Sequence, residues 1–163
     1  MCREELEQEI DPMTKEERLK ASEGTSPDVL AQLARDRDYN VRVRVARNPS
    51  TPPEILVQLA RDEDRDVRWR VADNPSTPPE VLAELSRDEN YYVRWNVTLN
   101  PSTPHEILTQ LARDENYNVR CSVAGNPSTP PEVLLILMVD DDEEVRKAAE
   151  RNLCTIVTIS LSL

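Results

Sequence analysis

The stretch Asn48-Pro-Ser-Thr-Pro-Pro-Glu54 decides the architecture of this chain, because it returns at Asn74 and at Asn126. A further copy begins at Asn100 and carries His105 where the others have the second of the adjacent prolines. Successive starts lie 26 residues apart, and a degenerate copy begins at Ser22. Near-identical units at such a period indicate a solenoid, and five units exceed the roughly three that a continuous core requires.

Each unit predicts two helices joined by a polar turn. Thr51 and Glu54 have the spacing of a capping box, and Pro52 suits the first helical position because that position needs no N–H group. The apolar residues that follow form one stripe, so this helix is expected to run to about Arg61. Asp64 is a suitable N-cap for a second helix over 65–73, which the following Asn-Pro ends.

A strand is the competing interpretation of the second helix, since valine and arginine alternate from Val41 to Val45. The counterparts of this segment carry a helical i, i+4 pair, as at Val67 and Val71, so the helix is preferred. We therefore expect an all-α solenoid of five 26-residue two-helix repeats, with the two helices either α/α or α/3₁₀. The first helix of one unit should lie beside that of the next, and their leucines should form one buried row. The predicted boundaries are an acidic segment with a capping helix over 1–21, repeats over 22–47, 48–73, 74–99, 100–125 and 126–151, and an apolar tail over 152–163.

The five copies of the second helix can be compared with one another. Valine recurs at the third position and arginine at the fourth, whereas the first, second, fifth, sixth and ninth positions vary freely. At about 100° per residue, the steady and the variable positions fall on opposite sides of the helix. The steady side should pack against neighbouring units, and the variable side should form one exposed surface on the inner side of the curve.

All four tyrosines and both tryptophans of the chain lie at the variable positions. Tyr, Trp and Arg dominate the hot spots of protein interfaces, and large rings in water are unfavourable, so a binding surface is preferred over ring packing between helices. We therefore expect a non-enzymatic scaffold that binds a protein or peptide partner. The candidate partner-binding residues are Tyr39, Arg44, Arg65, Trp69, Arg70, Tyr91, Tyr92, Trp95, Asn96, Tyr117, Asn118 and Cys121.

The alternative is a modular reader of single-stranded nucleic acid that stacks bases on the same rings. The local density of arginine favours it, with Arg44, Arg47, Arg65 and Arg70 close together in the sequence. The balance of 31 acidic against 20 basic side chains, a net charge of −11, and the absence of lysine from 21–146 count against it. Nucleic acid is therefore not the expected partner.

The composition does not predict a catalytic, metal-binding or cofactor-binding site. The two glycines exclude a Gly-rich phosphate loop, and the single histidine, His105, stands in a solvated first turn rather than beside a nucleophile. Cys121 occupies a position that is Trp or Val elsewhere, and acidic turns such as 140–144 recur as helix caps without a glycine turn. We expect no catalytic residue, no metal and no cofactor. Three scattered cysteines, the absence of a secretory signal and the short apolar runs favour a cytoplasmic protein without a membrane segment.

Two rows of charged residues predict a ladder along the stack. The invariant arginines are Arg42, Arg68, Arg94, Arg120 and Arg146, and the aspartates of the turns are Asp36, Asp62, Asp88, Asp114 and Asp140. Each arginine is expected to pair with a nearby aspartate of this series rather than to bind a ligand.

The C-terminal end is expected to be covered. The first helix of the last repeat is apolar on all sides from Val133 to Val139, and such a helix is normally buried on every side. The uncharged tail from Leu153 to Leu163 could cover it, either as an extended segment or as a helix, by folding back or by pairing with a second copy in a homodimer.

The unit as a whole resembles the leucine-rich repeat variant family. The resemblance rests on Leu82-x-x-Leu85, an acidic turn and a Val-Arg-x-x-Val-Ala segment before the next proline, and it covers 22–151. The stretch with Asp142, Val145 and Arg146 is also similar to HEAT-type repeats. The resemblance implies a right-handed helical superhelix, with α and 3₁₀ helices alternating. One member type carries an iron–sulfur cluster on clustered cysteines, but only Cys2 lies in that region here; some HEAT-like relatives are phycobiliprotein lyases, and no residue here supports that chemistry.

Overall fold

The structure, a computed structural model, describes residues 13–24 and 26–161, except the side chains of 159–161. Every regular element in these ranges is an α-helix, which confirms the predicted all-α solenoid. Both helices of a repeat are α-helical, so of the two expected forms the described residues show α/α and not the α/3₁₀ alternation that the resemblance implies. The first helices are α3 (Pro27–Leu33), α5 (Pro53–Leu59), α7 (Pro79–Leu85), α9 (His105–Leu111) and α11 (Pro131–Leu137). The second helices are α4 (Tyr39–Arg47), α6 (Arg65–Asp73), α8 (Tyr91–Leu99), α10 (Tyr117–Gly125) and α12 (Glu143–Leu161), and α2 (Lys15–Ala21) precedes them.

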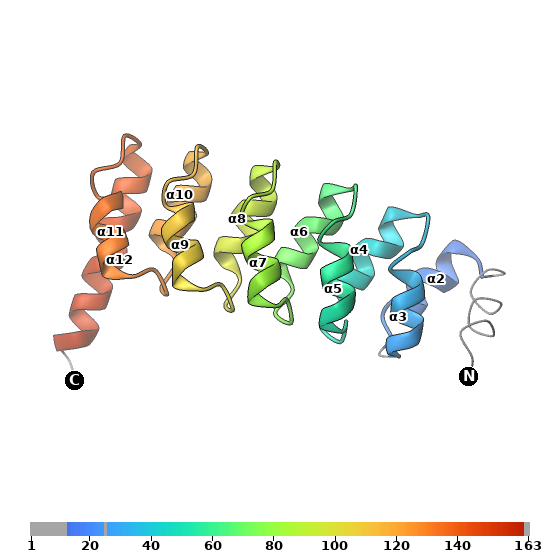
Figure 1. The fold of residues 1–163 in the computed structure, drawn as a ribbon. Helices are drawn as coiled ribbons and strands as arrows, with labels where there is room; N and C mark the ends of the chain where they lie inside the picture. Colours follow the sequence, from blue (N-terminus) through green and yellow to red (C-terminus); the bar gives the residue numbers. More distant parts are fainter. Residues whose placement is uncertain (1–12, 25, 162–163) are drawn as a thin grey trace.

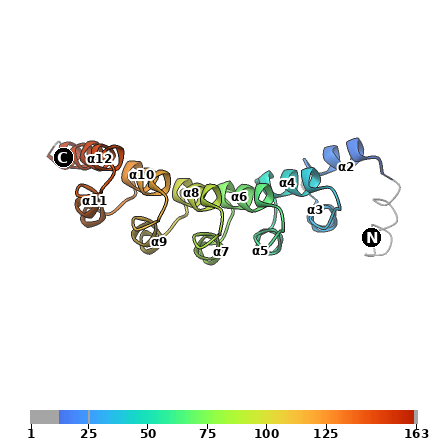
Figure 2. The same cartoon turned by 90° about the horizontal axis from the view of Figure 1, so that it is seen from above.

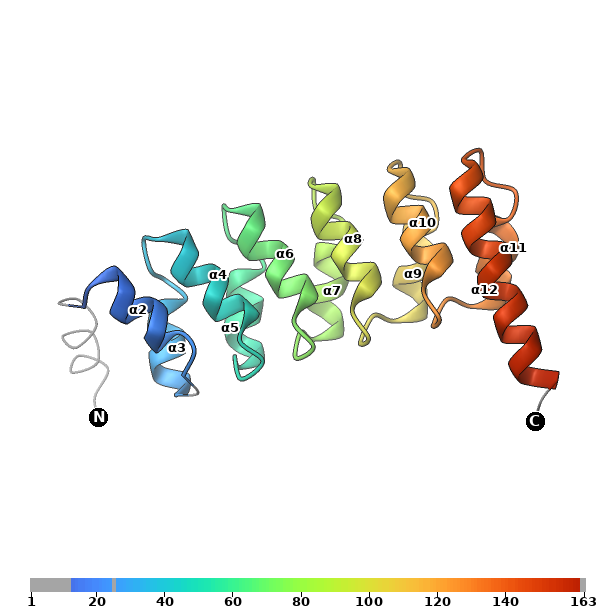
Figure 3. The same ribbon diagram turned by 180° about the vertical axis from the view of Figure 1, so that it is seen from behind.

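The repeats follow one another in an elongated row, and their helices form two layers (Figure 1). Figure 2 shows the first helices in one layer and the second helices, with α2, in the other. The row is bowed, and the layer of second helices lies on the inner side of the shallow arc (Figure 2). Seen from behind, the second helices stand side by side as an unobstructed series (Figure 3). One face of each second helix is therefore free of other elements.

The core runs through the whole stack between the two layers. The predicted leucine row is confirmed, since Leu30, Leu56, Leu82, Leu108 and Leu134 are all fully buried. The valines of the steady side of the second helices are buried as well, as at Val93 and Val97. Contact between successive repeats runs mainly through the second helices. The first helices follow one another along the outer side of the arc, where contact between successive repeats is sparser (Figure 2).

The second helices begin as predicted, and the first helices do not. The side chain of Asp64 accepts a hydrogen bond from the Asp66 N–H, and the corresponding residues of the other repeats cap in the same way. Thr51, however, is not an N-cap: Pro52 occupies that position and the helix ends at Leu59. The Thr51 hydroxyl instead donates to the Val45 carbonyl at 2.6 Å, so it satisfies the end of the preceding second helix.

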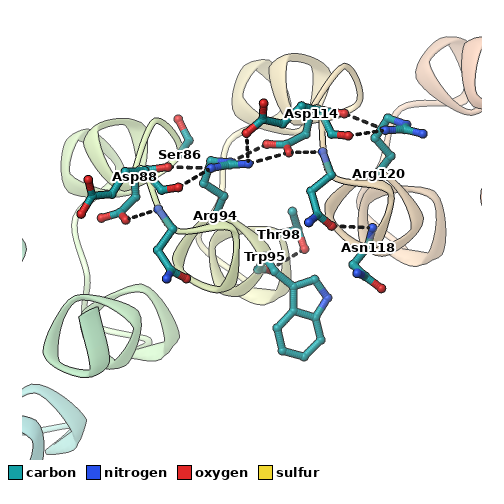
Figure 4. A network of polar contacts seen from close by, with 12 residues as sticks. Ser86, Asp88, Arg94, Trp95, Thr98, Asp114, Asn118 and Arg120 are labelled. Atoms are coloured by element: carbon teal, nitrogen blue, oxygen red, sulfur yellow. Dashed lines mark hydrogen bonds and ion pairs between the residues drawn. The ribbon is translucent and has the colours of Figure 1, made fainter. Parts of the chain in front are cut away.

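The predicted arginine–aspartate ladder is confirmed between repeats (Figure 4). Arg94 donates from Nε and Nη2 to the two carboxylate oxygens of Asp114 at 2.6 and 2.9 Å, and from Nη1 to the Asp88 carbonyl at 2.8 Å. The hydrogen bond to Asp114 raises the pKa of Arg94, which keeps the pair ionised. Such bidentate pairs fix both distance and orientation, so the ladder sets how each second helix stands against the next.

A second ladder starts from the asparagine before each Pro-Ser-Thr. The Asn100 side chain donates to the carbonyls of Ala72 and Asn74, at the end of the preceding second helix, at 2.7 and 2.9 Å. Its side-chain oxygen accepts the Ser102 N–H at 2.9 Å. The sequence pattern indicates this asparagine only as part of a helix stop. The signal for its structural role is its return at Asn48, Asn74, Asn126 and Asn152, because a buried amide that satisfies three backbone groups cannot be exchanged freely. Asn74 and Asn152 make the equivalent pair of donations. Asn48 donates instead to the carbonyls of Ser22 and Gly24.

The two ends of the solenoid differ. At the N-terminal end α2 lies in the layer of second helices, and Arg18 pairs with Asp36 at 2.6 Å, so the ladder continues onto it (Figure 2). The acidic segment expected before α2 falls on residues 1–12, outside the described residues.

At the C-terminal end α12 continues as one helix of 19 residues, so the extended form of the tail is wrong up to Leu161. The reason is local: Leu153, not proline, follows Asn152. The last first helix is not buried on every side either. Leu135, Ile136 and Val139 are exposed at 58%, 49% and 80%. Nothing within the chain therefore covers this surface in the described residues, and the homodimer stays a prediction.

Candidate binding surface on the second helices

The inner surface is defined here as the residues at the first, second, fifth, sixth and ninth positions of the second helices. Of the predicted site residues, Tyr39, Tyr92 and Tyr117 are exposed at 43%, 50% and 48%. The tryptophans are half-buried and rest partly on the core. The inner surface therefore presents exposed tyrosines beside tryptophans that pack partly against the core. Of the others, Arg44 and Arg65 are exposed, and Arg70, Tyr91, Asn118 and Cys121 are half-buried.

Asn96 is the predicted site residue that the structure does not present to solvent. Its side chain is buried, with 6% of the residue exposed, and its amide donates to the Tyr92 carbonyl at 2.8 Å. The sixth position lies at the border between the variable and the steady side of the helix, so a short side chain there can turn toward the neighbouring repeat. The expected exposure of Asn96 is wrong.

A groove of about 620 Å³ lies on the inner surface between α8 and α10. Trp95 and Leu99 occupy the fifth and ninth positions of α8, and the same positions of α10 hold Cys121 and Gly125. A Cβ atom added at Gly125 would meet nothing within 4 Å. The groove thus arises because large side chains in one repeat stand opposite small ones in the next. Its lining consists of Tyr91, Tyr92, Trp95, Leu99, Asn118, Cys121, Ser122, Gly125, Asn126 and Pro127.

Sequence comparison of the repeats found five of these lining residues and missed the others. Leu99 and Gly125 stand at the ninth position, which is charged in the other repeats. A comparison of side-chain volumes between adjacent repeats was the signal that would have located the groove. No charged side chain lines it, so it suits an apolar group.

The two tyrosines at one end of the groove lie against each other. Their ring centroids are 4.2 Å apart with the planes tilted by 30°. The Tyr92 phenol raises the pKa of Tyr91, so this ring remains neutral at physiological pH. Together they form a rigid aromatic wall with hydroxyls at its rim, an arrangement that combines contact area with hydrogen bonding.

The arginines of α4 and α6 form a basic cluster beside the groove. The Arg70 guanidinium lies 3.5 Å from the centre of the Trp69 ring, a cation–π contact. Burial, and then the charge of Arg47, lower the pKa of Arg70. Its Nε is buried without a hydrogen-bond partner in the described residues. This charge is thus less well compensated than the charges of the ladder.

The structure gives no support to a catalytic or metal site in the described residues. Burial raises the pKa of Cys121, and the nearby Asp142 and Glu144 act in the same direction, so the thiol is not activated. His105 is exposed at the first position of α9, in the outer layer. Among the described residues no group of three His, Cys, Asp or Glu side chains could hold a metal, and no helix is long and apolar enough to cross a membrane.

Comparison with known proteins gives the family. The model of the leucine rich repeat variant family matches residues 39–64 and 117–142. A solved leucine-rich repeat variant, described as having a novel repetitive structural motif, is 31% identical over 93% of this chain, with a TM-score of 0.73. The chain spans 61% of that protein's length. An engineered protein of known structure, 20% identical with a TM-score of 0.51 over 95% of this chain and 58% of its own, shares the fold. No curated protein sequence matches. With matching repeats and a related solved structure along nearly its whole length, the chain belongs to the leucine-rich repeat variant family.

Proposed function

We propose that the chain is a non-enzymatic repeat scaffold that binds a protein or peptide partner on the inner surface of its second helices. The observation that carries the proposal is the groove between α8 and α10, with its volume of about 620 Å³ and its wall of Tyr91, Tyr92 and Trp95. The volume is within the range of sites that hold small ligands, and aromatic residues are those that most often anchor an interface. The ladders hold the helices in fixed positions, so the site is present before the partner arrives.

An open arc of repeats favours an extended segment over a compact ligand. The second helices of successive repeats follow one another along the inner side (Figure 2), so a peptide could contact several repeats in turn. The rings are already partly immobilised by contact with the core, so little side-chain entropy would be lost when a partner binds. These features favour hot-spot binding at Trp95 and its neighbours.

The experiment uses a displayed library of random peptides of about twelve residues, enough to cross several repeats at ~3.3 Å per residue. Binders selected on the wild-type protein are synthesised, and their affinities are measured by calorimetry. Gly125→Leu is the principal variant, because it fills the groove from a position with free space around it and Leu is the better helix former. It should lower affinity about 30-fold, as loss of a hot spot does, without lowering the melting temperature.

Val57→Ala is the matched control. Val57 is an exposed apolar residue of α5 in the outer layer, 37% exposed. It should leave the affinity of the selected peptides unchanged. Peptides that bind the wild-type protein and Gly125→Leu equally well would contradict the proposed site.

A further inference from the structure

We infer that the partner segment is an acidic peptide with one large apolar side chain, which fills the groove between α8 and α10 while its carboxylates lie over the arginines of α4 and α6. This inference rests on the proposed function and names the chemistry of the partner. It is carried by the way in which charge is distributed along the inner surface and by the partners that those charges have.

Charge changes along the inner surface from one end to the other. Four arginines stand at its variable positions on α4 and α6, and no charged residue lines the groove that follows. On α6 two aspartates, Asp66 and Asp73, offset half of that charge, and on α12 Glu143 and Glu144 are balanced by Lys147 and Arg151. The inner surface thus carries an excess of positive charge over α4 and α6 only, although the chain as a whole has a net charge of −11. A basic cluster maintained on so acidic a protein indicates a local demand for positive charge. The four arginines are Arg44, Arg47, Arg65 and Arg70.

These arginines are poorly compensated, in contrast to those of the ladder. Arg65 lies 3.8 Å from an oxygen of Asp66, and Arg70 lies 3.7 Å from one of Asp73, both on exposed carboxylates. Arg44 pairs with the exposed Glu23. For Arg47 the structure gives no ion pair within the described residues, and its side chain is exposed. Exposed pairs of this kind contribute little and are easily exchanged, so carboxylates of a partner could replace or complete them.

Arg70 shows the same demand from a partly buried position. Its Nε has no acceptor in the described residues, and its neighbours include the positive charge of Arg47. A carboxylate placed between the two guanidiniums would accept hydrogen bonds from both and reduce their repulsion. The Trp69 ring beneath Arg70 holds the guanidinium in place, so the site for this carboxylate is preorganised.

The arrangement of the helices sets the spacing in the partner. Packed helices are about 8–10 Å apart, so the middle of the groove lies roughly 12–15 Å from the axis of α6. An extended chain advances ~3.3 Å per residue. The acidic residues should therefore stand about four or five residues from the apolar side chain that enters the groove.

The test uses the peptides selected on the wild-type protein. If the inference holds, Asp or Glu is enriched about four or five residues from a Trp, Phe, Leu or Met in the selected sequences. Replacing those acids by Asn or Gln should weaken binding about tenfold, and so should Arg47→Glu. The two changes together should weaken binding far less than the product of the separate effects, because they remove one interaction.

Arg113→Glu is the control for charge, since it makes the same charge change at an exposed turn residue outside the inner surface. It should leave the affinity within about twofold of wild type at physiological ionic strength. Equal binding of the acidic and the amide peptides, with sensitivity to Gly125→Leu retained, would overturn the inference and leave the proposed function standing. Loss of the Gly125→Leu effect would overturn both.

An oligo(dT) of about twenty nucleotides forms the remaining arm of the test. Tighter binding of this strand than of the selected peptides, with a steep decrease in salt and sensitivity to Arg47→Glu, would overturn the inference in favour of nucleic acid. The net charge of −11 leads us to expect no such binding.

Discussion

The third and the last repeat share one sequence pattern and differ in what surrounds them. In the third, Leu82 is fully buried and Arg94 holds Asp114 of the following repeat. In the last, Arg146 contacts only the carbonyls of Asp140 and Asp141, and no carboxylate reaches it in the described residues. The contacts of each unit of this solenoid are therefore completed by the unit that follows it. Stability at any position therefore depends on neighbours as much as on the unit itself.

The largest expected difference between the two repeats is in the free energy of unfolding when a leucine of the first helix is truncated. Leu82→Ala should lower the free energy of unfolding by about 2–5 kcal/mol, because it leaves a cavity in the continuous core. Leu135→Ala, on the exposed side of α11, should change it by about 0.5 kcal/mol or less. Urea denaturation followed by circular dichroism measures both. Similar losses for the two variants would show that the outer side of α11 is covered in solution.

The ladder gives the next difference. Arg94→Ala leaves the buried Asp114 carboxylate without its partner and should cost about 3 kcal/mol. Arg146→Ala removes only hydrogen bonds to two carbonyls and should cost about 1 kcal/mol. Thermal and urea unfolding of the two variants side by side provides the measurement. An equal cost would contradict the view that the next repeat completes the pair.

Lowering the pH should destabilise the protein by weakening the ladder. Arg120 holds the pKa of Asp140 below its usual value, and contacts with Lys15 and Asn40 lower that of Asp38 to about 2. Groups with a lowered folded pKa stabilise the protein above the unfolded value of about 3.9, and this contribution is lost as the pH falls through the folded pKa. The melting temperature should therefore fall as the pH is lowered from about 5 toward 2.

Two variants separate the ladder from general acid effects. Asp140→Asn should be less stable than wild type at neutral pH, and the gap should narrow toward pH 2 because wild type then loses the same charge. Asp141→Asn, at an exposed turn residue beside it, should follow the wild-type curve. A gap for Asp140→Asn that stays constant with pH would contradict the assigned role of its carboxylate.

The smallest expected effect on stability comes from the end of α12. Ile156 is half-buried and Val157 exposed, so deletion of 154–163 should cost about 1 kcal/mol or less in a single chain. If the segment covers the last repeat of a second copy, the deletion should also halve the mass measured by light scattering. A soluble truncation with unchanged mass and melting temperature would contradict a covered end in either form.

Much of the fold was predictable because the repeat supplies an internal comparison. The period, the second helices, the buried leucine row and the pairing of Arg94 with a turn aspartate all follow from which positions stay constant. The role of Thr51 was not predictable in this way, since a threonine before two prolines can cap the helix after it or the helix before it. The choice depends on the angle at which Pro52 turns the chain, a tertiary property.

The binding surface was predictable as a side of a helix but not as a shape. Variation placed Trp95 and Cys121 on that side, yet the groove depends on a large residue of one repeat facing a small one of the next. Asn96 is the opposite case. Its position varies between repeats but lies at the border of the variable and the steady side, and its side chain is buried. The residue type at a single position reveals neither the groove nor the burial of Asn96, since both arise from contacts between two repeats.

The asparagine ladder has a consequence for how long such a protein can be. Each link joins successive units at a fixed offset: Asn74 donates to the Asn48 carbonyl and Asn100 donates to the Asn74 carbonyl, 26 residues back in each case. Excision of a whole unit, such as 74–99, would bring the next asparagine to the same carbonyls and leave every remaining link in register. Length is thus a free variable of this architecture, and the number of units can rise or fall by duplication or loss while the geometry of each junction is inherited unchanged.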